Sequence, residues 1–320
     1  METHHVLVTG AGGFIGSHLV QAFLRQADCT VLALSRKARP PGLPQARLLW
    51  KQGDVLNPAF LEETFSSLPI RSVIHLAALR GAGSGDARAY HAVNVEGTER
   101  LLDLSWKHAV NTFVFCSSVG VHGSIPAELP ATWKSPFHAD SLYHQSKISA
   151  EKIVERYIRR GLNAYIVRPT ITYGAGDTGF PKTLIDVVRK RRLLLPSDDI
   201  LIHLLSAGKL AELIRTMLFK TRQKELRTFI VADAEPISLK RLADLIHQHY
   251  YGVDYPALFS IPNVVFNGLE IAFRMMRNEK WRTRILLLSK SWYYDIQDTI
   301  RLCSYRPAET AQSFLKEMRV

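Results

Sequence analysis

A glycine-rich turn near the start of the chain constrains its fold more than any other feature. Residues Thr9–Gly16 read Thr-Gly-Ala-Gly-Gly-Phe-Ile-Gly, and they lie between the apolar run Val6–Val8 and an amphipathic pattern typical of a helix. Gly10 suits a tight turn with positive φ, Gly13 lets the backbone approach a pyrophosphate, and Gly16 allows the helix to pack closely on the strand. The first N–H groups of the helix would then face the phosphates. This order predicts a dinucleotide-binding unit, with an ordinary glycine-rich loop as the less favoured alternative.

Short apolar segments typical of strands alternate with helical patterns through the first half of the chain. Near-continuous apolar strands separated by helices indicate a parallel sheet that is covered on both faces. We therefore expect an α/β fold with a Rossmann doubly wound parallel sheet, whose strands end along one edge where ligands bind. The expected strands are His5–Thr9, Thr30–Ser35, Arg47–Gln52, Ser72–Leu76, Thr112–Ser117 and Asn163–Val167, and the expected helices are Gly13–Gln26, Pro58–Ser67, Ala87–His108 and Ser141–Arg160.

The alternation becomes less regular after Pro169. The short apolar run Thr228–Val231 is nevertheless expected to join the main sheet. We therefore expect residues 1–175 to form an NAD(P)-binding Rossmann domain, and residues 176–320 to form a smaller, mostly helical substrate-binding lobe interleaved with that sheet. Later helices are expected at Thr178–Arg191, Gly208–Lys220, Leu239–Tyr250, Val264–Met276 and Ala308–Met318.

The composition is that of a globular protein. The chain has 320 residues, of which 47% are hydrophobic, so a large core can form. Its cysteines, Cys29, Cys116 and Cys303, form neither a metal-binding pattern nor a disulfide framework, so no metal site is expected and a reducing cytoplasm fits best. No apolar run is long enough to span a bilayer, and the first strand follows Met1 too closely for a signal peptide. We expect a cytoplasmic protein.

The net charge of +12 has two interpretations. It is either a basic surface without specific meaning or an attraction to a phosphorylated cofactor, an anionic substrate or a membrane surface. No nucleic-acid-binding module is found, so nucleic acid is not an expected partner. The basic run Arg189–Arg192 is typical of a solvated helix end. Residues Phe273–Leu288 combine basic and apolar side chains as a membrane-surface helix does, but this interpretation ranks last, and a membrane surface is not an expected partner.

Three residues predict a catalytic centre. Tyr143 and Lys147 are four apart on an expected helix, so they share one face. A lysine ammonium near a phenol favours the phenolate and lowers its pKa, which allows proton transfer with a substrate oxygen near neutral pH. Ser118 follows the expected fifth strand, at the ligand-facing edge, where its hydroxyl could bind the same substrate oxygen.

Seven motifs, spread over about the first 175 residues, follow the order found in one enzyme superfamily. They are Thr9-Gly10-x-x-Gly13-x-x-Gly16, Gly53-Asp54-Val55, His75-Leu76-Ala77-Ala78, Asn94-Val95-x-Gly97-Thr98, Ser117-Ser118-x-x-Val121-x-Gly123, Tyr143-x-x-x-Lys147 and Arg168-Pro169-x-x-x-Tyr173-Gly174. On these motifs the chain resembles an extended short-chain dehydrogenase/reductase. That superfamily includes nucleotide-sugar epimerases and dehydratases, dihydroflavonol reductases and 3β-hydroxysteroid dehydrogenases.

The resemblance implies a role for each matching residue. Tyr143 would be the acid/base and Ser118 its partner, while Lys147 would also hold the nicotinamide ribose. Superfamily members often dimerise through two long helices, here 87–108 and 141–160, so a homodimer is expected. Asp54 and Val55 would contact the adenine, Leu76, Ala77 and Ala78 the middle of the cofactor, and Pro169 and Thr170 the nicotinamide. The full set of expected cofactor-binding residues is Gly10, Gly13, Phe14, Ile15, Gly16, Ser35, Arg36, Asp54, Val55, Leu76, Ala77, Ala78, Tyr143, Lys147, Pro169 and Thr170.

Structural roles remain open for several of these positions. Asp54 could instead cap the next helix. Asn94, which the resemblance makes a support of the active site, could simply bridge a helix and a strand. Tyr173 could serve packing alone. His75 is expected to be a buried, hydrogen-bonded strand histidine rather than a catalytic group.

The end of the second strand bears on the choice of cofactor. A site that prefers NAD usually has an acid here for the ribose 2′-hydroxyl, but this chain has Ser35 followed by Arg36 and Lys37. Arginine suits a 2′-phosphate because its planar fork can bind two oxygens. We therefore expect NADP(H) to be preferred, with NAD(H) as the other option; alternatively, both cations point to solvent.

The chain departs from the superfamily pattern at three places, two of them in its second half. His122 replaces the usual tyrosine before Gly123, an acidic pair is missing from 202–209, and Leu193–Pro196 replaces the usual glycines. These departures weaken the case for sugar-nucleotide contacts. Residues 261–295, which include Trp281, look more like the steroid-dehydrogenase and flavonol-reductase branch and would cover an apolar substrate. The equally weighted alternative is a helix face that simply packs on the core.

The leading hypothesis is therefore an NAD(P)-dependent oxidoreductase. It would transfer a hydride between the nicotinamide and a small carbonyl or alcohol substrate, with Tyr143 as the acid/base. The alternative is a nucleotide-sugar epimerase or dehydratase that recycles its cofactor within each turnover. A non-catalytic dinucleotide sensor is a third hypothesis, against which the intact Ser118, Tyr143 and Lys147 argue.

Overall fold

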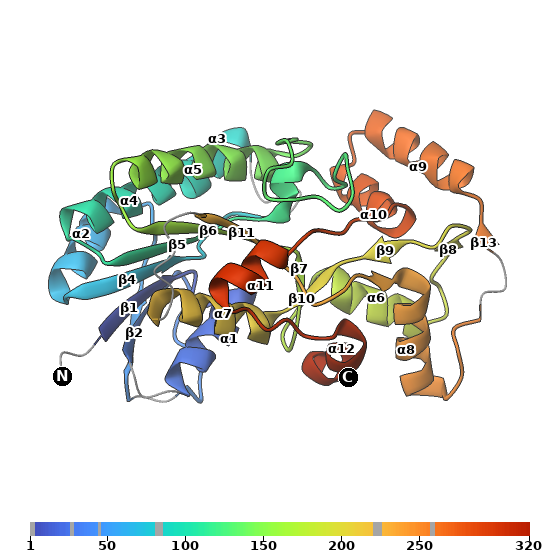
Figure 1. The fold of residues 1–320 in the computed structure, drawn as a ribbon, viewed down its shortest axis with the longest axis horizontal. Coiled ribbons are helices and arrows are strands. Elements are labelled where there is room, and N and C mark those ends of the chain that lie inside the picture. The colour runs from blue at the N-terminus through green and yellow to red at the C-terminus, as the bar shows by residue number, and fades with distance from the viewer. Residues whose placement is uncertain (1–3, 26–28, 44–45, 81–85, 220–225, 257–259) are drawn as a thin grey trace.

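A seven-stranded parallel sheet forms the frame of the molecule (Figure 1), in the order β11-β6-β5-β4-β1-β2-β3. The computed structural model describes residues 4–25, 29–43, 46–80, 86–219, 226–256 and 260–320. The strand order reverses between β1 and β4, which creates the crevice where open α/β sheets bind ligands. The strands are β1 (His4–Thr9), β2 (Cys29–Ser35), β3 (Leu48–Gln52), β4 (Ile70–His75), β5 (Thr112–Cys116), β6 (Ala164–Pro169) and β11 (Thr228–Val231). The expected Rossmann doubly wound fold is confirmed.

Helices cover both faces of this sheet, and each face has its own apolar core. On one face Val8, Val114 and Val167 pack against α1 and α7; on the other, Leu7, Phe113 and Ile166 pack against α2, α4 and α5. Alternate residues of the same strands thus enter opposite cores, which explains why the strands read as continuous apolar runs. These helices are α1 (Phe14–Leu24), α2 (Pro58–Ser67), α4 (Gly97–Lys107), α5 (Leu142–Arg159) and α7 (Ala207–Phe219).

The prediction of one helix over residues 87–108 is wrong in detail. The segment is divided into α3 (Ala87–Tyr90), the π-helical segment η1 (His91–Glu96) and α4. The side chain of Asn94, within η1, hydrogen-bonds both backbone groups of Leu79 and the hydroxyl of Ser146 on α5. A π turn adds a residue to the helix, and such turns are frequent at functional sites. Asn94 therefore joins the loop after β4 to α5, the bridging role that the sequence left open.

The later part of the chain leaves the sheet, returns to it and leaves again. After β7 (Ile171–Tyr173) and α6 (Phe180–Arg189), the chain comes back through α7 and β11, which pairs with β6. Gln26 and Lys220, at the ends of two expected helices, lie outside the described residues. Residues 176–320, which the sequence predicted to form the lobe, contribute the strand β11 to the main sheet. The other elements of this region are β8 (Leu195–Pro196), β9 (Leu201–Ile202), β10 (Leu204–Ser206), β12 (Ile237–Ser238), α8 (Leu239–Tyr251), β13 (Ser260–Ile261), α9 (Asn263–Met275), α10 (Glu279–Ser289), α11 (Gln297–Cys303) and α12 (Thr310–Met318).

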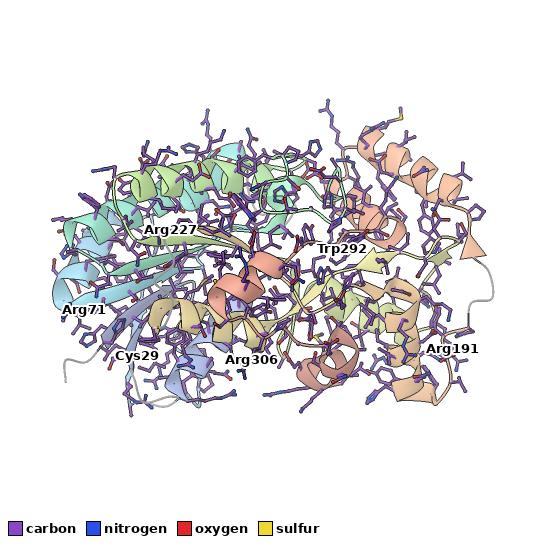
Figure 2. The ribbon with its side chains drawn as sticks, in the orientation of Figure 1. Cys29, Arg71, Arg191, Arg227, Trp292 and Arg306 are labelled. Atoms are coloured by element: carbon purple, nitrogen blue, oxygen red, sulfur yellow. The ribbon has the colours of Figure 1, made fainter. Side chains whose placement is uncertain are left out.

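The outer end of the lobe is formed by α9 and α10, which pack on each other (Figure 1). Trp292, labelled in Figure 2, follows α10 where the chain turns back from these helices. It is fully buried, and its indole packs edge-on against Phe180 of α6. No helix within the described ranges is long and apolar enough to cross a membrane.

Candidate active site

The glycine turn forms a cradle that accepts no side chains. Gly10 has φ +69°, and a Cβ there would lie 2.7 Å from the backbone nitrogen of Ala77. A Cβ on Gly16 would lie 2.2 Å from the carbonyl oxygen of Gly10. Gly13 is the N-cap of α1, and no side chain caps this helix, so its first N–H groups remain available to an anion. This cradle fits the pyrophosphate of a dinucleotide.

One cavity of about 1170 Å³ extends from this cradle past Tyr143 and into the lobe. It is lined by Ser118 and by every residue that the sequence predicted to bind the cofactor. The structure therefore brings together the ends of β1, β2, β4, β5 and β6 with the start of α5, as the parallel topology requires.

The three expected catalytic residues meet within this cavity. Ser118 follows β5, and its Oγ accepts a hydrogen bond from the Gly120 nitrogen at 3.0 Å. Tyr143 and Lys147 lie one turn apart on α5, and the Lys147 ammonium is 6.0 Å from the centre of the Tyr143 ring. Lys147 Nζ donates to the carbonyl oxygen of Cys116 at 2.7 Å, so the main chain of β5 fixes its position.

Burial dominates the electrostatics of this group. It raises the pKa of Tyr143, an effect opposed by the positive charge of Arg80 and by a hydrogen bond from Ser118. Burial also lowers the pKa of Lys147 to about 8. The sequence predicted that Lys147 lowers the tyrosine pKa, but the nearby cation that does so here is Arg80. Arg80 also lines the cavity, and no motif pointed to it.

Two buried hydroxyls on the cavity wall have no hydrogen-bond partner within the described residues. They are Ser117 Oγ at the end of β5 and Thr170 Oγ1 after β6. Because an unpaired buried polar group is costly, such atoms suggest a bound polar partner. Thr170 lies where the resemblance expects the nicotinamide, and its free hydroxyl fits the amide of that ring.

The structure also shows which of the structural roles left open for Asp54 and His75 these residues have. Asp54 does not cap α2: its Oδ1 accepts from the Leu56 nitrogen, and Asn57 is the cap. His75 is a buried strand histidine between the hydroxyls of Thr9 and Thr98, and burial lowers its pKa to about 3.

Tyr173 does more than pack, because its hydroxyl donates to Asp233 at 2.8 Å and also contacts the hydroxyl of Ser313. It therefore connects β7 to the loop after β11 and to α12.

The lobe adds cations that the motifs did not reveal. Arg192, Lys280 and Arg284 line the cavity. The basic run 189–192 is exposed at the end of α6, as expected of a solvated helix end, and Arg192 also lines the cavity. Arg189 and Arg191 lie over the rings of Tyr250 and Tyr251 of α8, and Figure 2 labels Arg191 beside that helix. The mixture of basic and apolar residues in 273–288 was the sequence pattern that contained Lys280 and Arg284. This pattern could not show that their side chains line the cavity.

The sequence motifs also did not indicate His144, which is next to the expected acid/base Tyr143. His144 Nδ1 lies 2.5 Å from the Asp140 carboxylate, and both residues are mostly buried. A Cβ on Gly120 would collide with the imidazole of His144, so the turn after Ser118 packs closely against this ring. This contact ties the turn that carries Ser118 to the helix that carries Tyr143.

The sequence profile of the NAD dependent epimerase/dehydratase family matches residues 6–214. The chain belongs to this family. It is an enzyme of the extended short-chain dehydrogenase/reductase superfamily, as the motifs predicted, whereas the narrower steroid-dehydrogenase and flavonol-reductase branch stays a prediction.

The curated relatives that the chain matches agree with this family. The chain is 30% identical over 207 residues to UDP-glucose 4-epimerase 2 of Arabidopsis thaliana, covering 58% of this chain and 59% of the relative. It is 35% identical over 170 residues to UDP-glucose 4-epimerase of Caenorhabditis elegans, covering 47% and 48%. The chain thus spans about half the length of the curated relatives it matches.

Two similar solved structures cover nearly the whole fold. UDP-glucuronic acid 4-epimerase from Bacillus cereus in complex with NAD has a TM-score of 0.76 at 19% identity, covering 98% of this chain and 97% of that one. UDP-glucose 4-epimerase from Thermotoga maritima with UDP-glucose has a TM-score of 0.77 at 19% identity, with the same coverage. At this identity the likeness establishes the fold alone.

Proposed function

We propose that the protein is a nucleotide-sugar epimerase. The observation that carries this proposal is the chemistry of the cavity beyond Tyr143, where Arg192, Lys280 and Arg284 supply positive charge. A diphosphate needs such cations, whereas a neutral ketone or alcohol does not. The family and the named activities of its relatives support the same choice over a net carbonyl reductase. The epimerase, which the sequence ranked second, becomes the leading function.

The catalytic residues have complementary tasks in this proposal. Tyr143 removes the proton from a sugar hydroxyl and later returns a proton to the oxygen, and Ser118 holds that oxygen by a hydrogen bond. Lys147 keeps a positive charge beside the phenol. The bound dinucleotide would supply the hydride acceptor and, in the second half of the turnover, the hydride donor. Loss of the hydroxyl proton and of the hydride from the same carbon gives a keto sugar. Return of the hydride to the opposite face of that carbon, with a proton returned to the oxygen, gives the inverted alcohol with no net redox change.

The dinucleotide in this proposal is NAD. The family and the NAD in solved relatives support it, and they do not support the NADP preference expected from the sequence. In the structure Ser35 Oγ accepts from the Lys37 nitrogen at 3.0 Å, while Arg36 and Lys37 are exposed at the cavity edge. Both cations can therefore remain in solvent, which was the alternative interpretation.

A homodimer through α4 and α5 also stays a proposal, as does a location in the cytoplasm. Trp106 on α4 is exposed and has Arg160 over its ring. Light scattering on the purified protein would give its mass in solution. A monomer at micromolar concentration would remove this part of the proposal without affecting the epimerase assignment.

The activity is tested with UDP-glucose and UDP-galactose as probes. Interconversion followed by NMR, with no net absorbance change at 340 nm, is the expected result, and Tyr143→Phe abolishes it while leaving NAD binding intact. Stoichiometric accumulation of NADH with a carbonyl product would instead establish a net dehydrogenase. Turnover that survives Tyr143→Phe would show that the acid/base is assigned wrongly.

A further inference from the structure

The outermost helix of the lobe exposes an apolar face. In α9 the residues Val264, Gly268, Ile271 and Met275 follow one another at helical spacing. The same face is extended over about 160° of the helix surface by Val265, Leu269, Ala272 and the C-cap residue Met276. All eight are exposed; Val264 is 74% and Met275 79% accessible. A soluble helix normally buries such a face, so its exposure calls for a partner.

The opposite face of α9 is already used within the lobe. Phe266 is buried, Phe273 stacks on Trp281 of α10 with ring centres 6.0 Å apart, and Glu270 pairs with Arg282 at 2.6 Å. These contacts fix α9 on α10, so the exposed residues cannot turn inward without breaking them. The helix stands at the outer end of the molecule (Figure 1).

The charge around this face identifies the kind of partner. Residues 263–290 contain six Lys or Arg and two Glu, and one of these Glu is already paired with Arg282. Arg274 and Arg277 are both exposed at the end of α9 that carries Met275. An apolar helix face flanked by cations is suited to the boundary between lipid headgroups and acyl chains of an anionic membrane.

We propose that α9 and α10 dock the enzyme peripherally on an anionic lipid bilayer. The helix α9 lies in the plane of the surface, with Val264, Ile271 and Met275 among the acyl chains and Arg274 and Arg277 among the headgroups. The proposal needs no membrane-spanning segment. It reverses the low rank that the sequence gave to a membrane surface, because only the structure reveals that this face is unpacked.

Docking of this kind brings the catalytic cavity to the membrane. Leu269 of α9 and Lys280, Trp281 and Arg284 of α10 line the cavity and belong to the same pair of helices. Substrate would therefore enter from the side of the molecule that faces the lipid.

Vesicle flotation tests the proposal on the full-length protein. Vesicles of phosphatidylcholine alone are compared with vesicles that also contain phosphatidylglycerol, at moderate salt. Wild type is expected to float with the anionic vesicles and to stay behind with the neutral ones. Val264→Ser/Met275→Ser removes two apolar anchors that contact neither the cavity nor the core, and it should lower the fraction bound roughly tenfold.

Matched variants separate docking from general effects. Leu49→Ser/Val253→Ser removes two exposed apolar side chains elsewhere and should bind like wild type. Arg274→Glu/Arg277→Glu should lower binding to anionic vesicles roughly tenfold. The control Arg159→Glu/Arg306→Glu changes the net charge by the same amount at exposed sites away from α9. Arg306 is labelled in Figure 2. This control should bind like wild type.

Three results would overturn the proposal. Wild type that does not float, or α9 variants that float as well as wild type, would exclude docking through this face. Sedimentation that shows a dimer of wild type and a monomer of Val264→Ser/Met275→Ser would assign the face to a second copy. Because flotation requires no substrate, these results are independent of whether the proposed epimerase activity is found.

Discussion

Arg80 is the residue whose importance the structure changes most. Its charge lowers the pKa of Tyr143 against the larger effect of burial. Removing it in Arg80→Met should raise that pKa, so the pH at which kcat/KM rises should move to more alkaline values by several tenths to about one unit. The pH profile of epimerisation measures this shift. Arg80→Lys keeps the charge and should restore the wild-type profile, whereas a profile that does not move in Arg80→Met would exclude electrostatic tuning by this residue.

Substitution of Arg36 tests whether the protein prefers NAD or NADP. If NAD is the cofactor, its Kd should be the lower of the two, and Arg36→Ala should change it by no more than about twofold because an exposed cation contributes little to a neutral ribose. Titration calorimetry with NAD⁺ and NADP⁺ gives both constants. Tighter binding of NADP⁺ that is lost in Arg36→Ala would restore the preference that Ser35-Arg36-Lys37 predicted.

A buried ion pair holds α5 against β6. Arg168 of β6 donates to Glu151 of α5 through two nitrogens at 2.9 and 2.6 Å, and both side chains are almost inaccessible. Glu151→Ala leaves a buried guanidinium unpaired and should lower the free energy of unfolding by about 3–5 kcal/mol in urea titration.

A nearby exposed pair provides the control for this change. Glu155 and Arg159 lie on the same helix, 4.0 Å apart and in contact with solvent. Glu155→Ala should therefore cost less than about 1 kcal/mol. Equal effects of the two substitutions would mean that the buried pair does not hold α5 in place.

Elements were predictable from sequence where the local pattern and the tertiary environment agree. Strands such as β1 and β5 have apolar runs that only a doubly covered sheet satisfies, so their positions were predicted within about one residue. The division of 87–108 was not predictable, since η1 depends on Asn94 reaching Leu79 and Ser146 from other segments. The short helix α11 was not predicted, and for α10 the mixture of basic and apolar residues in 273–288 indicated a helix without giving its bounds.

For the whole molecule, the sequence located half of the candidate site. The half toward the cofactor comes from motifs at the ends of successive parallel strands, so topology alone brings them together. The half toward the substrate combines Arg80, Arg192, Lys280 and Arg284, which lie on segments far apart in the chain. The exposure of the apolar face of α9 could not be predicted from sequence either. The periodicity of its apolar residues is identical whether the helix packs on a core or faces solvent.

Buried histidines make the stability of the whole molecule depend on pH. Burial lowers the pKa of His75 to about 3 and that of His203 to about 4, so the unfolded chain binds more protons than the folded one below pH 6.5. Stability present above pH 6.5 is therefore lost as the pH falls. Asp233 acts in the opposite sense, since burial raises its pKa to about 6 and its protonation favours the fold as the pH drops.

The two histidines outweigh the single acid. Between pH 7 and pH 5 they should remove about 4 kcal/mol, and Asp233 should return about 1. Burial also lowers the pKa of His122, which acts in the same sense as the two histidines, so the free energy of unfolding should fall by at least about 2–3 kcal/mol. Urea titrations at the two pH values measure the difference. His203→Gln should reduce the fall, whereas His91→Gln, at an exposed position, should not. Stability that is constant or higher at pH 5 would mean that His75 and His203 are not held neutral in the folded protein.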